Sequence, residues 1–391
     1  GFTITELSGT SVNESGTTDT FTIVLDAQPT DDVVVAIASS DTGEATVNGP
    51  LTFTSGNWDT PQTVTVTGVD DDLIDGTVTS TLTISIVDAV SDDDFDAVAD
   101  QTVSAATTDD DVAGFTIAET DGSTSVAESG TTDTFTVVLD AEPASDVVLT
   151  ITSGDTGEAT VTSALTFTSA NWDTAQTVTV TGTDDDVIDG TVASTITLSI
   201  NDGSSDNNFD SVSDQTVSVT TTDDDVAGFT IAVTDSSTSV GESGTTDTFT
   251  VVLDAEPASD VVLTITSSDT GEATVNSPLT FTSANWDTPQ TVTVTGVDDD
   301  IIDGTVTSTL TIAVDDSNSD NDFDSVANQT VSAATTDDDV AGFTIAETDG
   351  STSVAESGTT DTFTVVLDAE PASDVVLSVS SGDTGEATVH G

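Results

Sequence analysis

The sequence contains no lysine, no arginine and no cysteine, and its only histidine is His390. Against this stand 73 aspartates and glutamates in 391 residues, which give a formal net charge of −73. No lysine or arginine salt bridge can form, so the folded chain must withstand its own repulsion with cations taken from solution. Phosphate recognition requires lysine or arginine, which excludes nucleic acid as a partner. Polybasic attachment to an anionic membrane is excluded for the same reason.

The same absences argue against catalysis. Without cysteine or lysine, a general base near neutral pH would have to be a carboxylate with a shifted pKa. A carboxylate pair of the glycosidase type stays open in principle. The acidic residues recur in every copy of a repeat, however, and active sites are rarely duplicated along an array, so we expect no enzyme. No disulfide can form. The sequence shows no signal peptide and no transmembrane run, so we expect no direct membrane insertion.

The chain repeats itself with a period of 113 or 114 residues, and Gly1, Gly114, Gly228 and Gly342 open equivalent copies. Solenoid repeats are much shorter, so the period predicts a tandem array of whole domains. We expect domains over residues 1–113, 114–227 and 228–341, and an incomplete fourth copy, with N-terminal strands only, over residues 342–391. We expect this last copy to be part of a longer array and to be ordered only when another segment completes it.

Within a copy the apolar residues alternate with polar ones, which is the period of a β-strand. Phe21, Ile23 and Leu25 form one such run, and Val64 and Val66 form another. Their partners are mostly threonine, which suits a half-exposed pleated face, and Gly, Pro, Asn and Asp separate the runs. About seven short strands in a little over a hundred residues predict an all-β fold, an antiparallel, immunoglobulin-like β-sandwich in each repeat.

Acidic residues recur at five matching places in each repeat, in loops or at strand ends. In the first repeat they are Glu14, Asp41, Asp70, Asp71, Asp72, Asp75, Asp109, Asp110 and Asp111. In the second they are Glu128, Asp155, Asp184, Asp185, Asp186, Asp189, Asp223, Asp224 and Asp225. In the third they are Glu242, Asp269, Asp298, Asp299, Asp300, Asp303, Asp337, Asp338 and Asp339, and in the fourth we expect Glu356.

The triplet Asp109–Asp111 lies between the last strand of one repeat and Phe115, which opens the next. Two charges about 4 Å apart repel by roughly 1 kcal/mol in water and more near a protein surface, so a compact joint requires a cation. Carboxylate oxygens suit Ca²⁺, which takes 6–8 oxygen ligands. An EF-hand does not fit, because a loop starting at Asp71 puts Leu82 where its glutamate belongs. The alternative is that the clusters are solvated turns.

Several motifs resemble those of Calx-β domains, the calcium-binding modules of sodium/calcium exchangers and many large bacterial surface proteins. They are Ser-Val-Ala-Glu-Ser-Gly (125–130), Asp155, Leu-Thr-Phe (165–167), Val-Thr-Gly-Thr-Asp-Asp-Asp (180–186) and Asp-Asp-Asp-Val-Ala-Gly (223–228). The likeness spans nearly every residue of each copy. Residues 279–296 also resemble repeats of long bacterial and cyanobacterial surface proteins. The resemblance implies calcium ligands at Glu14, Asp41, Asp70, Asp71, Asp75 and Asp109–Asp111.

One position departs from that family. Where it often has a further glutamate, three residues after the Asp75 position, this chain has Val78, Val192 and Val306. One or two ions per joint are therefore expected rather than four. A second acidic loop, Asp92–Asp94 before Phe95, is either another calcium site or a solvated loop anchored by a buried phenylalanine. Trp58 precedes a strand, and we expect it in the core or at a corner rather than stacked on a carbohydrate.

Near-identical copies produce length, so the sequence favours a structural, extracellular or cell-surface protein, a stalk or filament stiffened by Ca²⁺. Self-association or continuation of the array in a fibre is the partner we expect besides calcium. Two other functions stay open. One is an adhesin segment that binds a surface or a glycan, which would need an atypical domain. The other is a matrix protein that buffers calcium.

Overall fold

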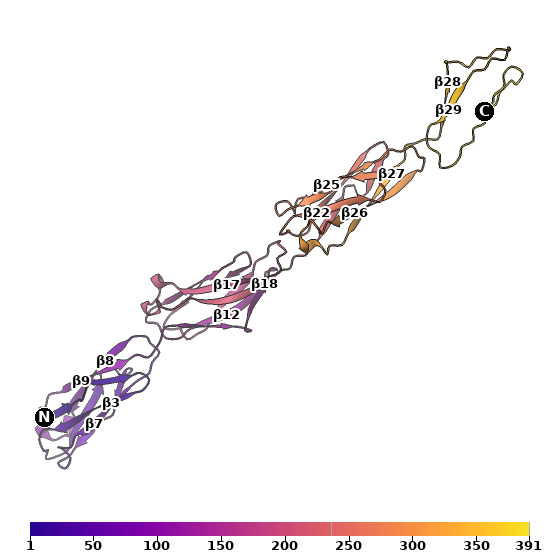
Figure 1. Ribbon diagram of the computed structural model, residues 1–391. Helices are drawn as coiled ribbons and strands as arrows, with labels where there is room; N and C mark the ends of the chain where they lie inside the picture. Colours follow the sequence, from indigo (N-terminus) through magenta and orange to yellow (C-terminus); the bar gives the residue numbers. More distant parts are fainter. Residues whose placement is uncertain (236, 391) are drawn as a thin grey trace. The chain divides into compact units, whose positions relative to one another are not determined.

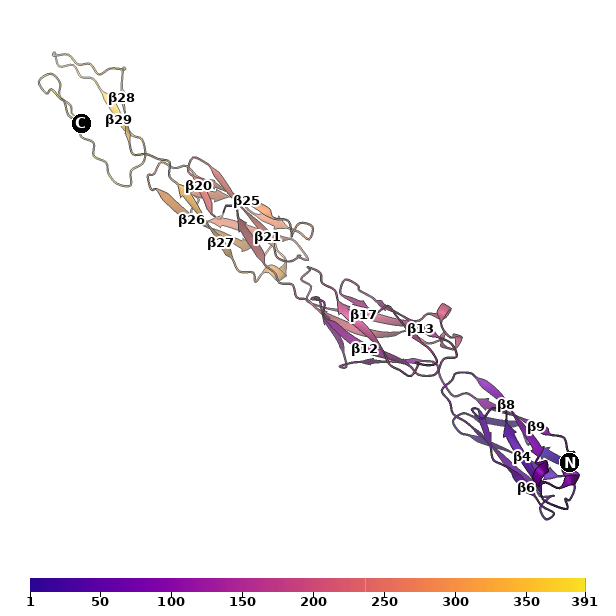
Figure 2. The ribbon, with the colours of Figure 1, turned by 180° about the vertical axis from the view of Figure 1, so that it is seen from behind.

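The computed structural model describes residues 1–235 and 237–390. Its regular elements are β-strands and a few one-turn 3-10 helices, and each of the first three repeats folds its strands into a β-sandwich (Figure 1, Figure 2). The all-β sandwich expected from the alternating pattern is confirmed. Among the residues that the structure describes, no helix is long and apolar enough to cross a membrane.

In the first repeat, every residue of which is described, the chain forms nine strands and two short helices. The strands are β1 (Phe2–Thr5), β2 (Thr10–Asn13), β3 (Thr18–Leu25), β4 (Val33–Ser39), β5 (Ala45–Val47), β6 (Leu51–Phe53), β7 (Gln62–Gly68), β8 (Thr77–Ile86) and β9 (Gln101–Thr108). The helices η1 (Asp88–Val90) and η2 (Asp93–Phe95) lie between β8 and β9. One sheet has the order β1-β3-β7-β5 and the other β2-β9-β8-β4-β6.

The next two repeats reproduce this arrangement. The second has β10 (Phe115–Glu119), β11 (Thr124–Ala127), β12 (Thr132–Leu139), β13 (Val147–Ser153), β14 (Ala159–Val161), β15 (Ala164–Phe167), β16 (Gln176–Gly182), β17 (Thr191–Ile200) and β18 (Gln215–Thr222), with η3 (Asp202–Ser204) and η4 (Asn207–Phe209). The third has β19 (Phe229–Val233), β20 (Thr238–Gly241), β21 (Thr246–Leu253), β22 (Val261–Ser267), β23 (Ala273–Val275), β24 (Leu279–Phe281), β25 (Gln290–Gly296), β26 (Thr305–Val314) and β27 (Gln329–Thr336), with η5 (Asn321–Phe323).

The core lies between the two sheets of each repeat and follows the period of two. On β3, Phe21, Ile23 and Leu25 are at most 2 % exposed, while Thr22 and Val24 between them are only partly buried. Phe53 from β6 and Leu82 from β8 enter the same cluster from the other sheet. Burying a side chain of this size contributes roughly 1.5–3 kcal/mol, which is why the alternating residues fix the strand faces.

The predicted count of about seven strands becomes nine for two reasons. The first stretch of each repeat is divided into β1 and β2, which join different sheets, and the short β5 adds an edge strand. The pairing is also not wholly antiparallel, since β2 lies parallel to β9, with Val12 opposite Thr107. A crossover from one sheet to the other places the end of β2 beside the end of β9.

A close backbone approach follows from that crossover. Gly68, at the end of β7, lies so near β2 that a Cβ there would stand 2.1 Å from the carbonyl oxygen of Asn13. Real Cβ atoms do not come that close, so glycine is required at this position. The contact holds the start of the loop after β7 directly against the residue that precedes Glu14.

The second acidic loop is anchored by the protein itself. The carboxylate of Asp92 accepts hydrogen bonds from the backbone N–H of Asp94 and of Asp31, and from the N–H and hydroxyl of Thr30. Phe95 beside it is 4 % exposed. These bonds, that of Asp94 foremost, lower the pKa of Asp92 to about 2. The structure therefore favours the anchored loop over a second calcium site. Trp58 packs against the core, as expected.

Residues 342–390 differ from the first three repeats. They form β28 (Phe343–Glu347) and β29 (Phe363–Leu367), which pair antiparallel as a two-stranded sheet. Phe343 is 51 % exposed, whereas its counterpart Phe115 is 3 % exposed. The strand equivalent to β1 is thus formed and paired, but the apolar side that the other repeats cover stays open.

Internal contacts divide the chain into two compact units. The first comprises residues 1–184 and 191–222, and the second residues 185–190 and 223–391. The first unit contains the whole first repeat and most of the second. The second unit contains the whole third repeat, residues 342–391 and the loop at residues 185–190.

Candidate metal centre

Glu14 is the innermost acidic residue of the first repeat. It follows β2, and its backbone N–H donates to the carbonyl oxygen of Thr108, which extends the parallel β2–β9 pairing. The side chain is 1 % exposed. Neither carboxylate oxygen has a hydrogen-bond donor within bonding distance. A buried carboxylate without a donor is costly, because it loses its water and gains nothing in return.

Glu44 is a second buried carboxylate, which the sequence analysis missed. It immediately precedes β5 and is 6 % exposed. Its carbonyl oxygen accepts hydrogen bonds from the N–H of Val69 and the hydroxyl of Thr107, which fix its backbone between β7 and β9. Its Oε2 atom has no hydrogen-bond donor. The signal that could have found it is Asp-Thr-Gly-Glu-Ala, which recurs at 41–45, 155–159, 269–273 and 383–387.

The loop between β7 and β8 carries the next carboxylates, and Asp109 organises it. One oxygen of Asp109 accepts from the N–H of Asp75 and of Gly76, at 3.1 and 2.9 Å, and the other accepts from Asp111 at 2.7 Å. Gly76 has a φ of +81°, a conformation that favours glycine. Asp109 thereby links the loop that carries Asp71 and Asp75 to the linker that carries Asp111.

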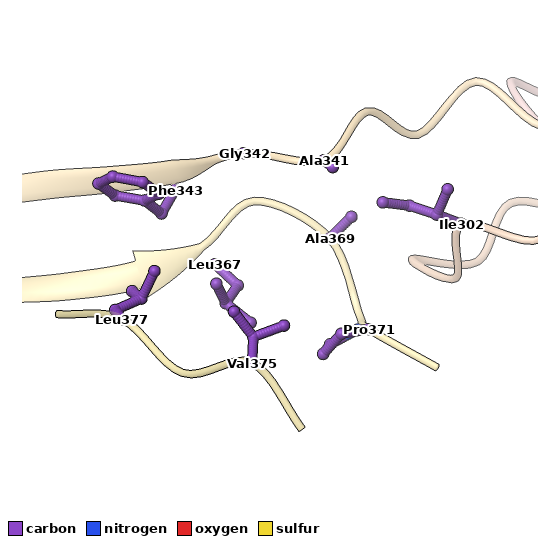
Figure 3. Close-up of a pocket in the computed structure, with 9 residues that line it drawn as sticks. All are labelled: Ile302, Ala341, Gly342, Phe343, Leu367, Ala369, Pro371, Val375 and Leu377. Atoms are coloured by element: carbon purple, nitrogen blue, oxygen red, sulfur yellow. The ribbon is translucent and has the colours of Figure 1, made fainter. Parts of the chain in front are cut away.

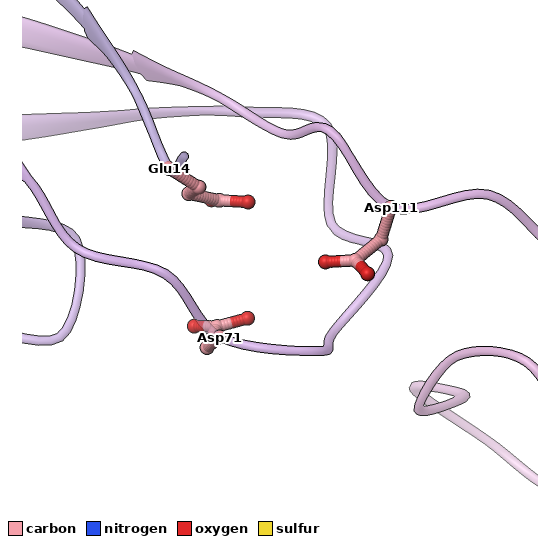
Figure 4. Close-up of side chains that lie close together, drawn as sticks. All are labelled: Glu14, Asp71 and Asp111. Atoms are coloured by element: carbon pink, nitrogen blue, oxygen red, sulfur yellow. The ribbon is translucent and has the colours of Figure 1, made fainter. Parts of the chain in front are cut away.

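Two sets of carboxylates converge as a result. In each set, one oxygen per residue lies within 4.8 Å of one oxygen of the others, and Glu14 belongs to both. One set is Glu14, Asp71 and Asp111, whose side chains face a common space (Figure 4). The other set is Glu14, Glu44 and Asp75. Acids that are 57 or more residues apart from Glu14 in the sequence, such as Asp71 and Asp111, are brought to it by the sandwich topology.

The electrostatics of this site oppose ionisation. Burial, followed by the charges of Asp109 and Asp71, raises the pKa of Glu14 to about 7. Burial and then the charge of Asp75 raise the pKa of Glu44. The pKa values of Asp75 and Asp111 are raised as well, first by burial and then by neighbouring aspartates. The protein supplies no positive charge here, so a cation would meet an unbalanced negative site.

The third repeat reproduces the arrangement within the second unit. Glu242, Asp299 and Asp339 bring carboxylate oxygens within 4.8 Å of one another. Glu242 is 1 % exposed, and burial raises its pKa despite a backbone N–H from Asp338. The buried Oδ2 of Asp339 has no hydrogen-bond donor. Glu272, the counterpart of Glu44, is 6 % exposed, and its pKa is raised by burial and then by Asp303.

The carboxylates of the second repeat are divided between the two units. Glu128 and the missed Glu158 are buried in the first unit, which also contains Asp155 and Asp184. The second unit contains Asp185, Asp186, Asp189, Asp223, Asp224 and Asp225. Within it, Asp223 accepts hydrogen bonds from Gly190 and Asp225, as Asp109 does in the first repeat. The local organisation of the linker triplet is therefore the same.

Several predicted site residues lie around the converging sets rather than in them. Asp41 is exposed and accepts from the N–H of Gly43, and Asp269 does the same with Gly271. In Asp109 and Asp337, both carboxylate oxygens accept hydrogen bonds from backbone N–H groups. Asp70, Asp72 and Asp110 belong to neither set of the first repeat, and Asp298, Asp300 and Asp338 do not belong to the set Glu242, Asp299 and Asp339. Glu356 is exposed, because residues 342–390 lack the strands that bury Glu14 in the first repeat.

The residues fit a hard divalent cation. Calcium–oxygen distances are about 2.3–2.6 Å, so two oxygens on one ion lie at most about 5 Å apart, and both sets meet this limit. The donors are all carboxylates, the ligands that Ca²⁺ prefers over soft metals. The donor-free oxygens of Glu14 and Glu44 are the groups that a cation would satisfy.

The loop that carries Asp71 and Asp75 also contacts the following repeat. Leu73 forms a parallel bridge with Glu142, flanked by hydrogen bonds from Glu142 to the carbonyl oxygen of Asp72 and from Ile74 to that of Glu142, at 2.7 and 3.3 Å. Ile74 packs against the core of the second repeat. The side-chain amide of Asn208 donates to its carbonyl oxygen at 2.9 Å. One short loop therefore serves both the acidic site and the neighbouring repeat.

The second unit contains the same contact twice. Val187 bridges Glu256 and Ile188 packs on the core of the third repeat, while Ile301 bridges Glu370. Ile302 then lines an apolar pocket of about 340 Å³ with Phe343, Leu367, Ala369, Pro371, Val375 and Leu377. Figure 3 shows the Ile302 side chain directed toward Ala369. The pocket is open because residues 342–390 do not form the core that covers the equivalent isoleucines elsewhere.

No family model matches this sequence, and no curated protein matches it. Among solved structures, similar ones include CBD12 from CALX1.2, with 14 % identity and a TM-score of 0.24, covering 56 % of this chain and 99 % of that one. Domains 4–9 of the surface-layer protein SbsC have 18 % identity, a TM-score of 0.25, and coverage of 89 % and 49 %. The titin fragment I67–I69 has 9 % identity, a TM-score of 0.27, and coverage of 84 % and 95 %. At these values the similarity adds nothing to the strand topology given above.

Proposed function

We propose that this chain is a structural, calcium-stiffened array of β-sandwich repeats at the cell surface or outside the cell. The observation that carries the proposal is the set Glu14, Asp71 and Asp111. Glu14 belongs to the body of the repeat, Asp71 to the loop that contacts the next repeat, and Asp111 to the linker. A cation held by all three joins these parts, and Glu14 has no other partner for its charge.

The role of the ion is electrostatic and mechanical. When bound, it supplies the positive charge that the sequence lacks and removes the repulsion among the triplets Asp70–Asp72 and Asp109–Asp111. The chain itself provides the rest. Asp109 holds the loop against the linker through three backbone N–H groups, and Leu73 and Ile74 attach the loop to the second repeat. Without the ion, repulsion acts on this same loop.

Calcium is the cation we propose, and an extracellular setting suits it. Extracellular modules bind Ca²⁺ with dissociation constants of about 10⁻⁴–10⁻³ M, and millimolar calcium fills such sites outside the cell. Repetition of the same site in successive repeats favours a stiff array over a buffer, because each site lies where one repeat meets the linker to the next. Self-association, or continuation of the array, is the partner we propose besides calcium.

Small-angle scattering and calorimetry of the whole chain test the proposal. In EDTA, only an ensemble of widely differing conformations should fit the scattering curve. In 2–5 mM Ca²⁺ (roughly the extracellular range), an ensemble of closely similar conformations should fit it. The melting temperature, Tm, should rise by several degrees in the same titration, because the ion binds the folded state alone. Added NaCl at matched ionic strength should reproduce only part of the rise. An unchanged Tm and an unchanged curve would refute the calcium function.

A further inference from the structure

Five carboxylates converge in the first repeat, and they do so around two centres rather than one. Glu14, Asp71 and Asp111 form one set, and Glu14, Glu44 and Asp75 form the other. Glu44 is not among the residues that the family resemblance implies, and it lies in a different loop from every predicted ligand except Asp41. Glu44 is nevertheless only 6 % exposed, and its Oε2 has no hydrogen-bond donor.

Its backbone position is built by the fold. The carbonyl oxygen of Glu44 is held by Val69 at 2.9 Å and by the Thr107 hydroxyl at 3.4 Å. In the third repeat, Val297 and Thr335 hold Glu272 in the same way, at 2.8 and 3.3 Å, and the Oε2 of Glu272 is also buried without a donor. A glutamine would fill the same volume without a charge. Both repeats instead have a buried glutamate with an unsatisfied oxygen at this position, which indicates that a cation binds here.

Charge gives the number of ions. The five carboxylates of the first repeat carry five negative charges. One Ca²⁺ leaves them with a net charge of −3 around two buried glutamates, Glu14 and Glu44, and two leave −1. A shared carboxylate that bridges two calcium ions is consistent with the membership of Glu14 in both sets, because each of its two oxygens is free.

We propose that each complete repeat holds two calcium ions with different tasks, an inner one bound by Glu14, Glu44 and Asp75 and an outer one bound by Glu14, Asp71 and Asp111. The inner set draws its ligands from three loops of one sandwich, so its ion stabilises the repeat itself. The outer set includes Asp111 of the linker, so its ion stiffens the joint. This inference rests on the proposed calcium function and divides it between two positions.

The test replaces the inner ligand in every complete repeat of the full chain, Glu44→Gln, Glu158→Gln and Glu272→Gln. Equilibrium dialysis against ⁴⁵Ca²⁺ should show about half the calcium bound per chain at saturation. In EDTA the Tm of this variant should be higher than that of the parent chain, because a buried unpaired charge is gone. In Ca²⁺ its Tm gain should be smaller, while scattering should still report stiff joints.

Two further variants complete the experiment. Asp111→Asn, Asp225→Asn and Asp339→Asn together remove the outer ligand, and we expect flexible joints in Ca²⁺ with much of the Tm gain retained. Asp59→Asn, Asp173→Asn and Asp287→Asn remove the same charge at exposed positions. This control should bind as much calcium as the parent chain and should keep both its Tm gain and its stiff joints.

The outcomes separate the two proposals. If the parent chain binds no calcium, the proposed function fails and the two-ion division fails with it. If the parent chain binds calcium and stiffens, but the glutamine variant binds the same amount with the same Tm gain, Glu44 is no ligand and only the two-ion division fails. Loss of all calcium in the glutamine variant would also overturn it, because the positions would then form one indivisible site.

Discussion

Leu73 of the first repeat pairs in parallel with Glu142 of the second, and it lies between a residue of the acidic site and a residue that contacts the second repeat. Asp71, two residues before it, turns a carboxylate oxygen toward Glu14, and Ile74, one residue after it, packs against the core of the second repeat. The backbone between them is short and hydrogen-bonded on both sides. Movement of the carboxylate end of this loop is therefore transmitted to its apolar end within about 10 Å of chain.

The apolar end can be tested without touching any carboxylate. Ile74→Ala removes most of the side chain that enters the core of the second repeat, at a cost of about 1 kcal/mol, because the residue is only partly buried. We expect calcium binding to be unchanged and the first joint to become flexible in Ca²⁺, as seen by scattering. Leu7→Ala is the matched control, since Leu7 is 96 % exposed. A flexible joint in the control as well would assign the effect to something other than docking.

The linker end is tested by changing Asp109, Asp110 and Asp111 together to Asn. Asp109 accepts from three backbone N–H groups, and asparagine keeps only one of its two acceptor oxygens, so the loop is held less tightly. The change at Asp111 removes a member of the outer set. We expect the β-sheet circular dichroism to stay largely intact, because the sandwich cores lie elsewhere. Scattering should show one flexible joint in Ca²⁺, with the other joints stiff.

The control for the triplet changes three other acidic residues, Asp93, Asp94 and Asp100, to Asn. All three are exposed and belong to neither of the two sets. This variant should scatter as the parent chain does in Ca²⁺. If the triplet variant also scatters as the parent chain, the triplet is a solvated turn and the stiffening mechanism is wrong.

The sandwich and most of the acidic positions could be predicted from the sequence, since alternation defines which side of a strand is buried and repetition marks shared loops. Glu14, Asp71, Asp75 and Asp111 were named on that basis, and the structure brings them together. Which of three adjacent aspartates turns inward was not predictable, because it depends on the turn after Asp109. Glu44 was missed because a single glutamate before a strand resembles an ordinary solvated strand end.

The strand pairing, too, could be predicted only in part from the sequence. Alternation predicts that residues 10–13 can form a strand, but not that β2 leaves the sheet of β1 and runs parallel to β9. That choice depends on contacts far apart in the sequence, such as Gly68 against the carbonyl oxygen of Asn13. It is also the choice that buries Glu14. The candidate metal centre therefore depends on a part of the topology that no local pattern encodes.

The acidic loop before Phe95 predicts a stability effect that does not depend on calcium. Asp92→Asn should weaken the hydrogen bonds from Thr30, Asp31 and Asp94, and we expect Tm to fall by several degrees equally in EDTA and in Ca²⁺. The pKa of Asp92 is lowered to about 2, so its contribution is present above about pH 4 and is lost as the pH falls toward 2. Asp93→Asn, next to it and exposed, is the control. A Tm loss confined to Ca²⁺ would instead mark the loop as a calcium site.

The pH dependence of the calcium-free protein tests the burial of Glu14. Burial and neighbouring carboxylates raise its pKa from 4.5 to about 7, so the folded state holds a proton that the unfolded chain releases. A group with a raised pKa adds stability that is complete below pH 4.5 and is lost as the pH rises through 7. In EDTA, the first repeat should therefore become less stable between pH 5 and pH 8, the reverse of ordinary acid denaturation.

Trp58 allows this to be measured in one repeat of the full chain. It packs against the core of the first repeat, and Trp172→Phe with Trp286→Phe leaves it as the only tryptophan. Its fluorescence should report a Tm that falls by several degrees from pH 5 to pH 8 in EDTA. The Tm gain caused by Ca²⁺ should grow over the same range, because the cation competes with the proton for Glu14.

Glu14→Gln in that background is the control that isolates this residue. Protonation of other carboxylates also relieves repulsion as the pH falls, and the variant retains that general effect. We expect its Tm in EDTA to depend less on pH than that of the parent chain, and to exceed the parent value most at pH 8, where Glu14 is charged. Equal slopes for the two proteins would mean that Glu14 is ionised at an ordinary pKa. A cation would then not be needed to balance it.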